Sequence, residues 1–313
     1  VARSVPKEET DARAKFREES RSALERQRVE LAQRLANTEA AFERVRLFLT
    51  TVASGDEAAA RAMLEDKMDP DATARGHEFA LHIAASNDDV SMVNCLLGAG
   101  AGIETRNAKG QSALCVAAEK CHIQVIHALL ERKASASAID NLGVNPLHYA
   151  AGQGRDDLIL ILLDAKADVQ NVATFHGRES TALQEASAEG HDVCVATLLA
   201  HRADPHLGHP RPLHIAAFQG HRLVVEQLLC AGAGPLEVSR GMTHWDSAKR
   251  FYVGQTALQV AEETPHTDVI DLLREWVCDK YEAAGTGPGQ TCRRCGKLEE
   301  AHHTALTKSA ARY

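Results

Sequence analysis

The residues whose types and spacing best suit chemistry lie near the C-terminal end of the 313-residue chain. Cys292 and Cys295 are separated by two residues and followed by glycine, a spacing at which two thiolates can bind one zinc ion. His302 and His303 would add imidazole nitrogens, and Cys278 is a further thiol. We expect one structural zinc ion at Cys292, Cys295, His302 and His303. A ligand from a partner, a redox CxxC motif and an unstructured tail are the alternatives.

The rest of the sequence carries no recognisable catalytic motif. We find no P-loop, GxSxG, HExxH or protein-kinase signature, so we expect no enzymatic activity. Five of the eight cysteines stand singly, which indicates a reducing intracellular compartment rather than a disulfide framework. The first residue is valine, so a targeting segment removed before it is compatible with the sequence.

Charge and hydropathy exclude further classes of function. The net charge of −8 does not favour a nucleic-acid partner, and Glu299 and Glu300 dilute the basic residues of the tail. No apolar run approaches the ~20 residues that a membrane helix needs, so we expect no membrane insertion. Aromatic residues make up only 4% of the chain, and a core must therefore be built from Ala, Leu and Val.

Most of the chain is made of a repeating element, because similar segments recur about every 33 residues. In six of these segments, two adjacent apolar residues, the second of them leucine, follow a turn residue at the same distance along the chain. The turn positions are Gly55, Asp88, Cys121, Gly154, Gly190 and Gly220, and the second leucine follows nine residues later, as at Leu163 and Leu229. A seventh unit ends at Leu272 and Leu273.

The segments NPLHYAAGQGRDDLILILLDAKADV (145–169) and RPLHIAAFQGHRLVVEQLLCAGAG (211–234) resemble ankyrin repeats. The resemblance covers about residues 47–276 in six or seven copies. It implies units of two short helices and a hairpin loop, stacked into a solenoid whose concave face and loops bind protein partners. In this family the histidine of the Leu-His pair, here His82, His148 and His214, hydrogen-bonds loop backbone.

Local signals agree with helix pairs of this kind. Asn145, Ser112, Thr181 and Thr256 stand where an N-cap side chain can accept from the first free N–H groups, and Pro146 and Pro212 suit the first helical turn. Gly154, Gly190 and Gly220 can take the left-handed conformation that ends a first helix. Phe79 and Arg211 depart from the family by replacing the capping threonine.

Aromatic residues gather at the irregular parts of the array. An insertion of 12 residues before the last unit carries Trp245, Phe251 and Tyr252. They form a candidate contact surface; the alternative is that they cover the apolar edge of the last repeat. Phe175 and His176 lie at another hairpin tip, and Phe218 occupies the pair before a turn glycine, which faces the concave groove in this family. Ordinary surface scatter is the alternative for these three.

The N-terminal segment is strongly charged. Residues 7–46 contain ten basic and nine acidic side chains, with no glycine or proline, which predicts a long exposed helix. Leu24, Leu31, Leu35, Phe42 and Leu49 form a thin apolar stripe along it. The helix is half of a coiled coil, a solvated single helix or a docking helix.

Together these patterns predict an all-α ankyrin-repeat solenoid with a long N-terminal helix and a small Cys/His tail. The expected domains are a charged helix over 1–46, the repeat array over 47–276, and a linker with a zinc knuckle over 277–313. The expected function is that of a non-catalytic scaffold or adaptor for a protein partner. An accessory subunit of a large assembly, docked by its helix and tail, is the alternative, followed by the regulatory region of an enzyme.

Overall fold

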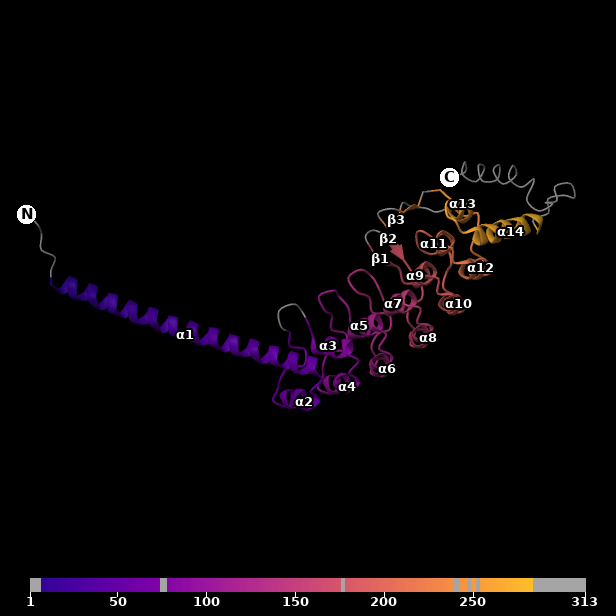
Figure 1. Ribbon diagram of the computed structural model, residues 1–313. Helices are drawn as coiled ribbons and strands as arrows, with labels where there is room; N and C mark the ends of the chain where they lie inside the picture. Colours follow the sequence, from indigo (N-terminus) through magenta and orange to yellow (C-terminus); the bar gives the residue numbers. More distant parts are fainter. Residues whose placement is uncertain are drawn as a thin grey trace, which may run out of the picture.

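The computed structural model describes residues 7–73, 78–175, 178–238, 243–246, 249–251 and 254–283. It is a row of helix pairs preceded by one long helix (Figure 1). The pairs run in chain order, and each packs on the next. The last turns of α1 (Lys7–Ser54) form the first pair with α2 (Glu57–Glu65). The prediction of an all-α solenoid is confirmed, with hairpin loops that form two short antiparallel ladders.

The first helices of the pairs stack in one row and the second helices in another (Figure 1). The further first helices are α3 (Ala80–Ser86), α5 (Ala113–Lys120), α7 (Pro146–Gly152), α9 (Ala182–Glu189), α11 (Pro212–Gln219) and α13 (Ala257–Glu262). The second helices are α4 (Val90–Gly98), α6 (Ile123–Glu131), α8 (Asp156–Asp164), α10 (Asp192–Ala200), α12 (Arg222–Cys230) and α14 (Thr267–Ala283). The hairpin loops project from the row of first helices, and we call the surface formed by these helices and loops the concave face.

One apolar core runs the length of the array because small and branched residues alternate between the two rows. The paired alanines of the first helices, such as Ala150 and Ala151, have no exposed surface, so neighbouring backbones approach closely. The first leucine of the pair in α4, α6, α8, α10 and α12, such as Leu162 and Leu198, is also completely buried. A single pair would leave these faces in water, and stacking covers them.

The predicted capping residues act as expected. Ser112, Asn145, Thr181 and Thr256 each accept a hydrogen bond from the backbone N–H three residues later, and the last three form reciprocal capping boxes. Gly190 and Gly220 end their helices at φ values of 77° and 82°. Asp88 and Cys121, which replace glycine, adopt the same left-handed conformation at 58° and 59°.

Among the first helices from α3 to α13, the two that lack a side-chain cap each have a buried histidine nitrogen without a hydrogen bond. Phe79 and Arg211 provide no side-chain cap to α3 and α11. In the same two units, Nδ1 of His82 and of His214 is buried and has no hydrogen bond. By contrast, Nδ1 of His148 lies 2.6 Å from Oδ1 of Asn145, the capping residue of its own helix. The missing caps are therefore local losses of stability.

Restoring the cap should stabilise the protein. We expect Phe79→Thr to be about 1 kcal/mol more stable than Phe79→Val, because the two side chains match in size and only threonine can accept from the helix N–H groups. The comparison with valine removes the effect of losing the Phe79 ring, whose centroid lies 5.5 Å from that of His82. Urea unfolding of both variants measures the difference, and equal stabilities would contradict this account of the cap.

The long helix α1 crosses the predicted boundary at residue 46 without a break. Phe48, Leu49 and Val52 are buried in the array, whereas the N-terminal part of the helix projects away from it as a rod (Figure 1). Glu30 and Arg34, four positions apart on the helix, form an ion pair at 2.9 Å. Leu24, Leu31, Leu35 and Phe42 remain exposed.

Candidate functional site

The predicted contact residues lie on three parts of the array. Phe218 is half-buried near the end of α11. The backbone of Phe175 belongs to β1 (Ala173–Phe175), which pairs with β2 (Arg178–Ser180). His176 and Tyr252 lie outside the described residues, as do the side chains of Phe175, Trp245 and Phe251. Their role in binding stays a prediction.

The insertion forms a second hairpin. Strand β3 (Thr243–Asp246) pairs antiparallel with β4 (Lys249–Phe251), and the register shifts between His244 and Asp246, so that Trp245 is the extra residue of a bulge. A bridge between Val238 and Thr256 closes the base of the insertion. The backbones of Trp245 and Phe251 thus lie on the two strands of one hairpin.

The candidate zinc ligands Cys292, Cys295, His302 and His303 lie outside the described residues, so the zinc site stays a prediction. Within the described part of the chain, no three His, Cys, Asp or Glu side chains gather in a way that could hold a metal ion. In the same part, no helix is both long and apolar enough to cross a membrane.

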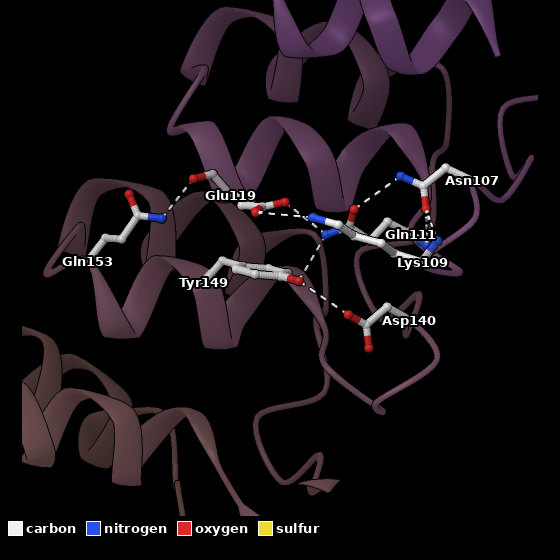
Figure 2. Close-up of polar contacts among 7 residues, drawn as sticks. All are labelled: Asn107, Lys109, Gln111, Glu119, Asp140, Tyr149 and Gln153. Atoms are coloured by element: carbon white, nitrogen blue, oxygen red, sulfur yellow. Dashed lines mark hydrogen bonds and ion pairs between the residues drawn. The ribbon is translucent and has the colours of Figure 1, made fainter. Parts of the chain in front are cut away.

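A polar cluster that the sequence analysis missed lies on the concave face and joins three repeats (Figure 2). Its centre is Tyr149 of α7. The Tyr149 hydroxyl donates to Oδ2 of Asp140 at 3.2 Å and accepts from Nε2 of Gln111 at 3.0 Å. Nε2 of Gln111 also donates to Oε2 of Glu119 at 2.8 Å, and Nζ of Lys109 lies 4.0 Å from the Glu119 carboxylate.

Further hydrogen bonds of Asp140 and Gln153 fix the cluster in place. Oδ1 of Asp140 accepts from the backbone N–H groups of Leu142 and Val144, at 2.8 Å and 2.9 Å, which fixes the carboxylate in its loop. Nε2 of Gln153 donates to the backbone carbonyl of Glu119 at 2.9 Å. The Tyr149 ring packs against the apolar core and remains partly exposed. Tyr149 is therefore ordered before any partner arrives.

The Tyr149 hydroxyl takes part in this cluster through its hydrogen bonds. Burial raises the pKa of the Tyr149 hydroxyl far above its ordinary value, and the charges of Asp140 and Glu119 raise it further. The hydroxyl is thus a neutral hydrogen-bond donor rather than a nucleophile. A sequence signal existed, since Tyr149 stands where the other units have Ile83, Val116, Ile215 and Val260, with Glu185 as the further polar exception.

The histidines of the Leu-His pairs have structural roles, as expected. Nε2 of His82 lies 2.8 Å from the carbonyl oxygen of Gln111, and Nε2 of His148 lies 3.1 Å from that of Ser180. Nε2 of His214 lies 3.0 Å and 3.2 Å from the carbonyl oxygens of Glu237 and Gln255. Each ring ties a first helix to loop backbone. Burial lowers the pKa of all three, and that of His214 to about 4.

The buried thiols are held in their protonated form. Burial raises the pKa of Cys115, and it raises that of Cys194 to about 11. A protonated thiol is a poor nucleophile and a poor metal ligand. The cysteines whose side chains the structure describes, namely Cys95, Cys115, Cys121, Cys194 and Cys230, are all free.

The stacked helix pairs and projecting hairpins define a helical repeat protein. The family model for ankyrin repeats in three copies matches residues 81–173, and that for a single ankyrin repeat matches residues 211–240. The crystal structure of the human ASB11 ankyrin repeat domain superposes with a TM-score of 0.60, at 22% identity, over 73% of this chain and 96% of that domain. The chain is an ankyrin-repeat protein.

Two curated relatives are similar to parts of this chain. A probable E3 ubiquitin-protein ligase of rice, XBOS32, is 32% identical over 191 residues, which are 59% of this chain and 37% of the relative. The tyrosine-protein kinase Shark of Drosophila melanogaster is 30% identical over 181 residues, which are 57% of this chain and 16% of the relative. This chain therefore spans well under half of either relative.

Proposed function

We propose that this chain is a non-catalytic adaptor that binds a protein partner on the concave face of its repeats. The observation that carries the proposal is the ordered, partly exposed ring of Tyr149, which Gln111 and Asp140 fix through its hydroxyl. Tyrosine is enriched among residues that dominate protein interfaces, and a side chain ordered in advance loses little entropy on binding.

The surroundings of Tyr149 support an extended contact. Glu119 lies on one neighbouring repeat, and Glu185 occupies the equivalent of the Tyr149 position on the next. Half-buried Phe218 lies two repeats further along the same row of helices. A partner segment laid across these repeats would meet aromatic rings flanked by carboxylates. Basic side chains beside apolar ones would suit this surface.

Changing Tyr149 should weaken capture of the partner. We expect Tyr149→Ala to reduce the amount of partner isolated with the full-length chain about tenfold or more, because the substitution removes the ordered ring. Quantitative mass spectrometry of the captured proteins measures the loss. Tyr149→Phe keeps the ring and loses only the hydroxyl contacts, so it should fall between Tyr149→Ala and the unchanged chain.

The matched control lies in the same repeat on the opposite side. Leu160 is 43% exposed on α8, in the row of second helices, and Leu160→Ala should leave capture unchanged. Circular dichroism establishes that each variant is folded. If Tyr149→Ala is folded and captures as much partner as the unchanged chain, the concave-face proposal is wrong.

A further inference from the structure

The part of α1 outside the array carries an exposed apolar stripe of four residues. Leu24, Leu31, Leu35 and Phe42 are 59%, 58%, 62% and 57% exposed. Each residue of an α-helix advances by about 100°, so these four side chains lie within an arc of about 40° on one side of the helix. We call this set the α1 stripe.

The α1 stripe lies on the same side of α1 as residues that pack against the repeats of this chain. Val45 is partly buried and Leu49 is buried against the repeats, and both follow the stripe at the same helical spacing. Toward the N-terminus the next positions of this spacing are Arg21 and Arg17, which are charged. The exposed apolar stripe thus runs from Leu24 to Phe42. Beyond Phe42, the array covers the apolar residues on this side of the helix.

The order of the spacings identifies what fits on the stripe. The steps between its residues are seven, four and seven, which read the same in either direction along the helix. A second copy of α1 running antiparallel therefore places Leu24 opposite Phe42 of the second copy, and Leu31 opposite Leu35 of the second copy. Apolar side chains then face apolar side chains in all four layers.

The charged residue inside the seam favours this direction. Arg28 lies on the same side of the helix between Leu24 and Leu31. In a parallel pair it would face Arg28 of the second copy, and like charges would meet in the seam. In the antiparallel pair it faces Thr38 of the second copy. We propose that the α1 stripe is a self-association site through which two copies of this chain pair in antiparallel orientation.

Charge substitutions in the two central layers test both the site and the direction. In the full-length chain, Leu31→Lys alone or Leu35→Glu alone should raise the dissociation constant of the dimer about tenfold or more, because each places a charge opposite leucine in two layers. The double variant Leu31→Lys with Leu35→Glu should restore the dimer, since lysine then faces glutamate in both layers. Sedimentation velocity over roughly 1–200 µM chain measures all of them.

Val29 provides the matched control, because it is 61% exposed on the opposite side of the same helix. Val29→Lys should leave the dissociation constant unchanged, and circular dichroism establishes that every variant is folded. A monomeric unchanged chain over the whole range overturns the proposal. So does a dimer that survives both single substitutions. A double variant that stays monomeric overturns the antiparallel pairing.

Discussion

Replacing Gly190 with alanine should lower the free energy of unfolding by roughly 2–4 kcal/mol. Gly190 ends α9 at a φ of 77°, where a side chain is strained. An added Cβ would also lie 2.5 Å from Nδ1 of His221, whose ring packs on the turn. Nε2 of His221 is 3.0 Å from the carbonyl oxygen of Ala188, so the ring has little freedom to move away. Urea unfolding of the full-length chain measures the loss.

Substitutions at two other glycines distinguish the cost of the strained backbone from the cost of the contact with the His221 ring. Gly100 has a φ of 92° and open space around it, so Gly100→Ala should cost only the backbone term of about 1 kcal/mol. Gly98 ends α4 with nothing within 4 Å, and Gly98→Ala should be neutral or slightly stabilising. In a His221→Ala background, Gly190→Ala should cost less than in the unchanged chain. If Gly190→Ala costs no more than Gly100→Ala, the ring does not restrain the turn.

Acid should destabilise the array through its buried histidines. The pKa of His214 falls from its ordinary 6.5 to about 4 because of burial, and burial also lowers the pKa of His82 and His148. Below pH 6.5 these histidines bind protons in the unfolded chain but not in the folded chain. Their contribution to stability is therefore fully present above pH 6.5 and is lost as the pH falls toward 4. His214 alone should contribute a loss of about 3 kcal/mol over this window.

The histidine contribution appears as a difference between pH profiles. Unfolding free energies between pH 7.5 and 5 should fall less steeply for His214→Gln than for the unchanged chain, by up to about 1.4 kcal/mol per pH unit. His127 is exposed on α6, and His127→Gln should keep the steep profile. Parallel profiles for His214→Gln and the unchanged chain would show that His214 is not the group that titrates.

The array was predictable because its signals are local and repeated. The caps at Ser112, Asn145, Thr181 and Thr256 and the left-handed turns at Gly154, Gly190 and Gly220 were expected from residue type alone, and all are present. The Leu-His histidines also bond loop backbone as the family resemblance implied. Each of these features depends on a few residues within one repeat or between adjacent repeats. Because the repeats are alike, those residues are placed in the same way from one repeat to the next.

The polar cluster around Tyr149 was not predicted, because it joins residues from three repeats. Gln111 and Tyr149 are 38 positions apart, and only the stacking of α5 on α7 brings them to 3.0 Å. Tyrosine among the aliphatic residues of its column was a sign of a special position. It did not indicate the partners, since their side chains come from loops whose course depends on the stack.

Hydrogen–deuterium exchange of the chain with and without its captured partner tests the concave-face proposal most directly. We expect partner binding to slow exchange in α5, α7 and α9 and in the loops around Lys109 and Asp140, because these backbones surround the Tyr149 cluster (Figure 2). The second helices α6, α8 and α10 should exchange as in the free chain. Protection confined to those second helices or to α1, with the concave face unchanged, would contradict the account.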